Sequence, residues 1–170
     1  MVVVALLGVG CKELLTAFES RETLSGYVDK SSYLPGETMR AYLSSNDLQG
    51  KASIRLYSID GQIVDEATAT LSSQAINGEQ PWSDGLGYEL TFEYTVPSLP
   101  SGIYLWEQSV PFIVRQSETT HPITVLYPSN TVAAYNSEGG RSLYHYNSDN
   151  GISADSVSFL RYGPLQPEAA

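Results

Sequence analysis

Few side chains in this sequence have the type and spacing that catalysis or metal binding requires. Cys11 is the only cysteine, which excludes an internal disulfide and any cysteine-based zinc site. The only histidines are His121 and His145, and a catalytic triad or histidine-rich metal site would need them close together with acids in range. We interpret both as ordinary loop residues. We therefore predict no catalytic residue.

The charge of the chain excludes some classes of partner. The net charge is −10, and Lys and Arg form no cluster anywhere. Binding of DNA or RNA depends on neutralising phosphates, and docking to anionic lipid also needs a basic patch. We therefore expect no nucleic-acid partner. The hydrophobic fraction of 42% and charged fraction of 16% are typical of a folded globular protein.

Cys11 is placed where a lipid could be attached. It follows the apolar run MVVVALLGVG, which has the length of a signal-peptide core but is too short to cross a bilayer as a helix. The small residues before Cys11 resemble the cleavage box of a bacterial lipoprotein. We predict that Cys11 is lipidated, which would make the protein membrane-anchored and extracytoplasmic, in the periplasm or at the cell surface of a bacterium. A plain N-terminal helix or strand and a retained membrane segment stay open. Residues 1–23 would then be the signal, anchor and short helical tether.

Residues 24–116 favour a mainly β fold, an immunoglobulin-like β-sandwich of about seven strands. Apolar and polar residues alternate along the segments, and turn signals recur between them. Asp60-Gly61 predicts a two-residue type I′ hairpin turn. Trp82 lies in a long polar loop, where it either folds onto the sandwich rim, the interpretation we favour, or contacts a ligand. The expected strands include residues 25–33, 38–45, 52–59, 62–71, 88–96, 103–109 and 110–115.

Residues 117–170 read as a short, incomplete α/β tail. A buried strand is expected at residues 123–128 and a helix at 131–136, capped by Ser129 or Asn130 and ended by Gly139-Gly140. A second short strand is expected at residues 157–161. An α/β domain needs several strand–helix units to cover both faces of its sheet. The tail must therefore pack against the preceding residues or against another chain.

Several motifs carry a family resemblance. The run LYPSNTVAAYNSEGGRSLY (126–144), together with PSGIY (100–104) and VPFIVR (110–115), resembles the large subunit of N,N-dimethylformamidase and its relatives. The resemblance implies hydrolysis of a small tertiary amide with iron held by two tyrosines and one glutamate. Only Tyr135, in the AYN motif, is carried over as a candidate iron ligand. We interpret Tyr135 and Tyr144 otherwise as packing residues under the helix.

Three functions follow from these patterns. The favoured one is a non-catalytic accessory subunit that is membrane-anchored, needs no cofactor, and docks onto a protein partner, with Trp82, Tyr144 and Tyr146 as candidate interaction residues. The alternative is a fragment of an iron-dependent amide hydrolase. The third is a carbohydrate-binding sandwich that uses Trp82, Tyr88 and Trp106.

Overall fold

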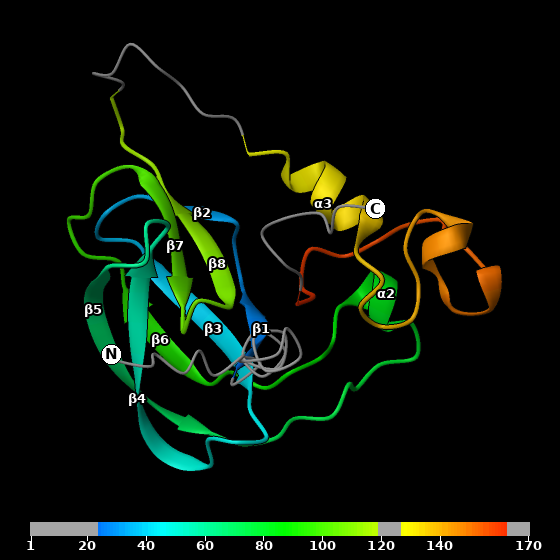
Figure 1. Ribbon diagram of the computed structural model, residues 1–170, viewed down its shortest axis with the longest axis horizontal. Coiled ribbons are helices and arrows are strands. Elements are labelled where there is room, and N and C mark those ends of the chain that lie inside the picture. The colour runs from blue at the N-terminus through cyan, green and yellow to red at the C-terminus, as the bar shows by residue number, and fades with distance from the viewer. Residues whose placement is uncertain (1–23, 119–126, 163–170) are drawn as a thin grey trace, which may run out of the picture.

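Two stacked β-sheets form the larger part of the molecule in the computed structural model, which describes residues 24–118 and 127–162 (Figure 1). One sheet has three strands in the order β1-β3-β6, and the other has five in the order β2-β8-β7-β4-β5. Neighbouring strands pair antiparallel except β2 and β8, which pair parallel. This mainly β architecture confirms the predicted sandwich.

The strands are short, as the spacing of the turn signals predicts. They are β1 (Ser25–Val28), β2 (Ser32–Tyr33), β3 (Thr38–Ser44), β4 (Gly50–Ser58), β5 (Ile63–Leu71), β6 (Phe92–Thr95), β7 (Gly102–Trp106) and β8 (Val110–Val114). The helical elements are α2 (Pro81–Asp84), α3 (Ser129–Tyr135) and two 3-10 turns, η1 (His145–Asn147) and η2 (Asp149–Gly151).

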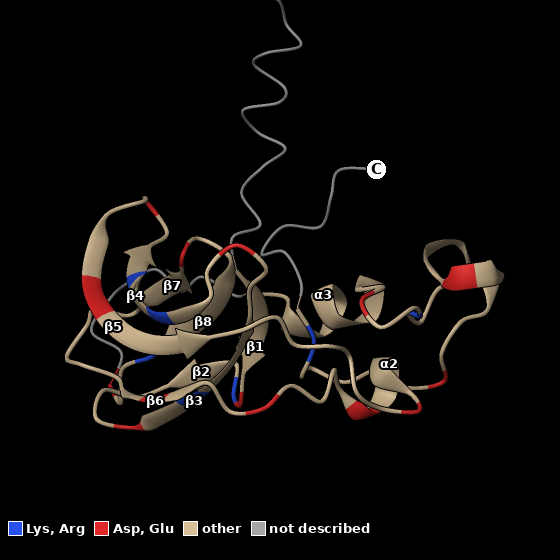
Figure 2. Cartoon of the chain, turned by 90° about the horizontal axis from the view of Figure 1, so that it is seen from below, with Lys and Arg blue, Asp and Glu red and all other residues tan. Residues whose placement is uncertain are grey.

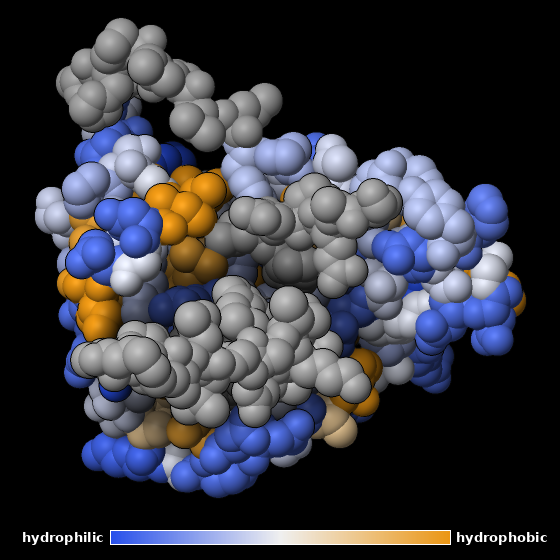
Figure 3. Space-filling model, viewed as in Figure 1, coloured by the Kyte–Doolittle hydropathy of each residue, from blue (hydrophilic) through white to orange (hydrophobic). Residues whose placement is uncertain are grey.

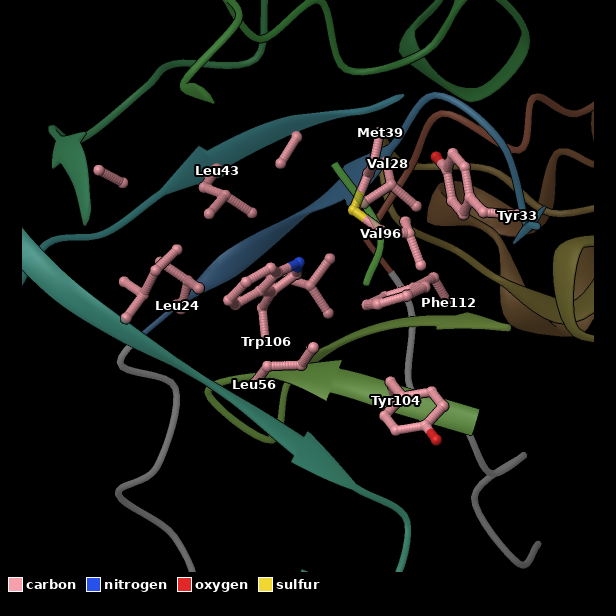
Figure 4. Packing of buried hydrophobic residues seen from close by; sticks show 14 of the residues in the cluster. Leu24, Val28, Tyr33, Met39, Leu43, Leu56, Val96, Tyr104, Trp106 and Phe112 are labelled. Carbon is pink, nitrogen blue, oxygen red and sulfur yellow. The ribbon is translucent and has the colours of Figure 1, made fainter. Parts of the chain in front are cut away.

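The core lies between the two sheets and is built by the period-two alternation of the strands. In β3 the side chains of Met39, Ala41 and Leu43 are fully buried, whereas Arg40 faces solvent, as predicted. Trp106 of β7 fills the centre of the core (Figure 4). Tyr94 of β6 also joins the two sheets, because its hydroxyl donates a hydrogen bond of 2.6 Å to Asp65 of β5. Burial raises the pKa of the Tyr94 phenol.

The first predicted strand is in fact two strands in different sheets. The sequence predicts a single strand over residues 25–33, yet β1 pairs with β3 in one sheet and β2 pairs with β8 in the other. Asp29 holds the crossing, since its carboxylate accepts hydrogen bonds from the Arg40 amide at 2.9 Å and the Tyr33 hydroxyl at 2.7 Å. The sequence pattern of residues 25–33 alone does not indicate these tertiary contacts.

The prediction of a long strand over residues 88–96 is also corrected. Only Phe92–Thr95 forms β6, and Leu90 is 48% exposed instead of buried. Side chains replace the backbone ladder before β6. Thr91 Oγ1 accepts from the Leu43 amide at 2.8 Å, and the Gln74 side chain accepts from the Glu89 amide at 2.6 Å. Gln74 thus lies where further strand pairing would have been.

The hairpin turns differ from the prediction at Asp60-Gly61. The β4–β5 connection is a longer turn, in which the Gly61 amide donates to Ser58 O at 2.9 Å and only Gly61, at φ 84°, is left-handed. The turn with two left-handed residues joins β7 to β8 instead. There Glu107 and Gln108 have φ of 46° and 60°, the sign pattern that a type I′ turn requires.

Gln108→Gly should stabilise the protein, because a left-handed conformation costs a residue with a β-carbon roughly 1–2 kcal/mol and glycine almost nothing. We expect a gain of about 1 kcal/mol in the free energy of unfolding, measured by urea denaturation. The matched control is Gly61→Ala, for which the same argument predicts a loss of about 1 kcal/mol although no atom lies within 4 Å of the added Cβ. A loss of stability in Gln108→Gly would contradict this account of the turn.

Candidate functional site

The tail begins with helix α3, which starts without the predicted side-chain cap. Pro128 occupies the N-cap position and no side chain caps the helix, so the expectation that Ser129 or Asn130 would do so is wrong. Ser129 lies inside the first turn, where its amide donates to Tyr127 O at 2.9 Å. The helix ends at Tyr135, because Asn136 is extended. Gly139-Gly140 therefore follows the helix end instead of forming it.

The predicted strands of the tail are not seen among residues 127–162. Residues 123–126 lie outside the described residues. Residues 157–161 form no strand and make single backbone contacts with the loop that carries α2: the Ser158 amide donates to Trp82 O at 2.8 Å, and the Leu86 amide donates to Leu160 O at 3.0 Å. The described tail thus packs against the preceding part of its own chain, one of the two possibilities left open.

Arg161 holds the tail together. Its side chain is buried, at 4% exposure, and its guanidinium donates to five carbonyl oxygens. These belong to Ser158 at 2.9 Å, Asn136 at 3.0 Å, Glu138 at 3.1 Å, Arg141 at 3.0 Å and Ala133 at 2.8 Å. Burial lowers the pKa of Arg161 to about 10, which leaves it charged at neutral pH. The carbonyls at the C-terminus of α3 carry the partial negative charge that suits this cation.

A second cation joins the tail to α2. The Arg141 guanidinium lies over the ring of Trp82, 4.3 Å from its centroid. Close packing accompanies this stack, because a Cβ on Gly139 would lie 3.0 Å from Pro81. Helices α2 and α3 both lie on the same side of the sandwich in two views (Figures 1 and 2). Trp82 therefore belongs to a helix that contacts the tail, where the sequence predicts a loop on the sandwich rim.

Three tyrosines gather on the surface of the tail, and we call them the tyrosine cluster: Tyr135, Tyr144 and Tyr146. The Tyr135 and Tyr144 rings stack with centroids 4.3 Å apart, and Tyr146 lies 5.6 Å from Tyr144 and 6.5 Å from Tyr135. All three are exposed, with Tyr146 at 65%. Hydrogen bonding to Tyr135 raises the pKa of both Tyr144 and Tyr146, so these two phenols stay protonated.

Two serines, Ser142 and the half-buried Ser148, fix the backbone of the tyrosine cluster. Ser142 is fully buried, and its hydroxyl both accepts from the Tyr144 amide at 3.0 Å and donates to Tyr144 O at 3.0 Å. The Ser142 amide donates in turn to Ser148 Oγ at 2.9 Å. The Asn147 side chain also hydrogen-bonds to Tyr135 O. The rings are thus held by a satisfied polar network, which is a property of preorganised binding sites.

The tyrosine cluster does not match the iron site that the resemblance implies. That site requires a glutamate beside two tyrosines, and the pKa of Tyr144 and of Tyr146 is raised by hydrogen bonding to Tyr135 and by burial, with no carboxylate contributing. Among the described residues, no group of three or more His, Cys, Asp or Glu could hold a metal ion. Phenolate ligation also needs an enclosed set of ligands, whereas these rings are exposed. The residues described do not make up this donor set.

A pocket of about 130 Å³ lies between the sandwich and the tail. Its walls are largely apolar and include Val28, Phe112, Val132 and Phe159. Its charged residues already have partners: Lys30 pairs with Glu37 at 3.6 Å, Asp29 accepts from Tyr33, and Arg161 donates to carbonyls. The pocket therefore offers apolar surface to a ligand, but its charged groups already bind other parts of the protein.

The sequence comparison identifies the family of the chain. A family model described as N,N-dimethylformamidase beta subunit-like, C-terminal, matches residues 54–168, more than half of the chain. The chain belongs to this family. The match begins within β4 and runs through the tail, so this part of the N,N-dimethylformamidase beta subunit-like family includes the later strands of the sandwich, β5 to β8, and the tyrosine cluster. The search of curated proteins returned no match.

The other predicted site residues are found in different places. Tyr144 and Tyr146 lie together in the tyrosine cluster, with Tyr135, whereas Trp82 is part of the α2–tail contact. Trp106 is fully buried in the sandwich, which removes it from the carbohydrate-binding hypothesis. Cys11 lies outside the described residues. Within the described residues, no helix has the length and apolar character needed to cross a bilayer.

Proposed function

We propose that this chain is a non-catalytic accessory subunit of the N,N-dimethylformamidase beta subunit-like family that docks onto a protein partner through its tail. The strongest support is the distribution of exposed apolar side chains. More than half of the large apolar side chains that are exposed among the described residues belong to residues 127–162. This docking surface consists of Tyr135, Leu143, Tyr144, Tyr146, Ile152, Phe159 and Leu160.

The chemistry of the docking surface favours a protein over a small ligand. Tyrosines dominate it, and their rings offer both apolar area and a polar edge, as is common at protein interfaces. On the face in Figure 3 the tail shows mostly pale and blue residues with small orange areas, so its polarity is mixed. Arg161 and Ser142 hold the backbone underneath, which lowers the ordering cost of binding.

The proposal includes an N-terminal lipid on Cys11, with the protein anchored at the membrane on its extracytoplasmic side. The support is the apolar run of residues 1–10 and the small residues before Cys11. Mass spectrometry of the mature N-terminus should show a diacylglycerol on this cysteine. Cys11→Ser should then move the protein from the membrane fraction to the soluble one. If the mass showed an uncleaved N-terminus with an unmodified Cys11, the lipid anchor would be removed from the proposal.

Co-purification with matched variants tests the docking role. The tagged full chain is recovered from detergent-solubilised membranes of its host, and its partner is identified by mass spectrometry. Tyr146→Ser with Leu143→Ser alters the docking surface, and Ile59→Ser with Ile63→Ser is the control, because these residues are as exposed but lie on the β4–β5 hairpin. We expect one stoichiometric partner, reduced at least fivefold by the tail variant only. Equal recovery with both variants would refute docking through the tail.

A second candidate function is hydrolysis of a small amide by an iron site. The convergence of three phenols in a member of this family is the observation that favours it. The carboxylate ligand would have to come from outside the described residues. Metal analysis of the purified full chain separates the two candidates. Stoichiometric iron that is lost in Tyr135→Phe would favour the hydrolase, and metal-free protein would favour docking.

A further inference from the structure

We propose that the tyrosine cluster binds an arginine side chain of the docking partner. This inference rests on the proposed docking function and names the group that the surface recognises. Aromatic faces attract cations through the negative potential above and below the ring. The cluster presents three such rings within 6.5 Å of one another, and each is more than one third exposed.

The charge of the chain suits a cation. The chain carries a net charge of −10, which attracts positive groups over a distance. Asp149 and Asp155 are exposed in the same segment, and Glu138 is partly exposed. The raised pKa of Tyr144 and Tyr146 keeps their phenols neutral at physiological pH. Their hydroxyls are also able to accept hydrogen bonds from a bound guanidinium.

The tail uses its own arginines elsewhere, so neither of them occupies the tyrosine cluster. Arg141 lies over Trp82, and Arg161 is buried among carbonyl oxygens. Residues 127–170 contain no further Lys or Arg. The tail therefore supplies no Lys or Arg to its three exposed tyrosine rings, and the neighbouring His145 ring makes an edge contact with Tyr146 at a centroid distance of 5.8 Å.

Arginine fits these faces better than lysine. A planar guanidinium stacks on an aromatic ring while its N–H groups stay free to donate, and it is more weakly hydrated than an ammonium ion. The same molecule already contains this arrangement, since the Arg141 guanidinium lies 4.3 Å from the Trp82 ring centroid. In contrast, the Lys30 ammonium lies 5.6 Å from the Tyr33 centroid and also pairs with Glu37.

NMR titration of the full chain tests the inference. The probes are acetyl-arginine-amide and acetyl-citrulline-amide, which have nearly the same shape but differ in charge. We expect the arginine probe to shift the ring signals of Tyr135, Tyr144 and Tyr146, and the citrulline probe to leave them in place. Tyr146→Leu should weaken binding of the arginine probe about two- to fivefold, whereas Tyr146→Phe keeps the ring face and should change it less than about twofold. The control is Tyr42→Leu, from a stacked tyrosine pair on the sandwich.

The outcomes separate this inference from docking itself. Equal shifts with both probes, or unchanged arginine binding in Tyr146→Leu, would overturn the arginine site. If that happens while partner recovery still depends on Leu143 and Tyr146, docking stands and only the recognised group is wrong. If the arginine probe bound but co-purification recovered no partner, the arginine site would stand and the accessory role would be refuted.

Discussion

Arg161→Ala should unfold the tail while leaving the sandwich folded. The substitution removes the donor for five carbonyl oxygens that come from two separate stretches of the tail, residues 133–141 and Ser158, at distances of 2.8 to 3.1 Å. Each buried acceptor left without a partner costs about 1–3 kcal/mol. The combined loss therefore exceeds about 3 kcal/mol, more than a segment with one short helix can withstand.

Hydrogen exchange measured by mass spectrometry reports this result directly. Amides of α3 and of residues 139–161 should lose protection, whereas amides of β3 and β4 should not. Arg40→Ala is the matched control, since this exposed arginine pairs with Glu93 at the surface at 3.0 Å and such pairs contribute little. Unchanged protection of α3 in Arg161→Ala would show that the arginine does not hold the tail.

Lysine should not substitute for Arg161. An ammonium ion has three donors on one atom, whereas the guanidinium reaches Ser158 through Nε, Asn136 and Arg141 through Nη1, and Ala133 through Nη2. Arg161→Lys keeps the charge and loses this geometry. We expect its exchange pattern to resemble that of Arg161→Ala. Protection equal to that of the parent would mean that charge at the end of α3 is sufficient.

The sandwich could be predicted because its strands carry their own pattern. In β3 and in the β4–β5 hairpin the inward residues alternate with polar ones, and the burial of Met39, Leu43, Ile54 and Leu56 follows that alternation. The sequence pattern fails where side chains from distant segments take over backbone pairing. Gln74 and Thr91 do this before β6, and Asp29 does it between β1 and β2.

The candidate site was only partly visible in the sequence. The AYN and SLY motifs point to Tyr135 and Tyr144, and Tyr146 is close enough in sequence to join them. The role of Arg161 left no signal, because its partners are backbone carbonyls that every residue possesses. The pairing of Trp82 with Arg141 also depends on residues far apart in the chain.

The contacts between α2 and the tail explain how a segment with one short helix can fold here. The tail lacks a described sheet of its own, so its backbone groups pair with the α2 loop through Ser158 and Leu160. Small residues permit this approach, since a Cβ on Gly85 would lie 2.9 Å from the Leu160 side chain. The loop that carries α2 consequently supports the tail, in which the side chains of Tyr135, Tyr144 and Tyr146 are exposed.

Trp106→Ala should be the most destabilising substitution in the sandwich. The indole is fully buried between the sheets and makes edge contacts with Phe92 and Tyr94, at ring-centroid distances of 5.3 and 4.9 Å. Truncating a buried tryptophan costs about 3–5 kcal/mol, because it removes apolar burial and leaves a cavity. That is a large part of the roughly 5–15 kcal/mol by which a domain is stable, so the variant should unfold at much lower urea concentration.

Trp106→Phe keeps the test interpretable if the alanine variant fails to fold. Within the described residues Trp106 Nε1 has no hydrogen-bond acceptor, so phenylalanine removes an unsatisfied donor as well as some volume. We expect its cost to stay below about 2 kcal/mol. Urea unfolding is followed by far-ultraviolet circular dichroism, with Trp82→Ala as the control, because that half-buried ring contacts the tail and not the core. If Trp106→Phe strongly lowered the free energy of unfolding while Trp82→Ala did not, the Trp106 N–H would have an acceptor that stabilises the core. A Trp106→Ala protein that unfolds at the same urea concentration as the parent would contradict the central position assigned to this ring.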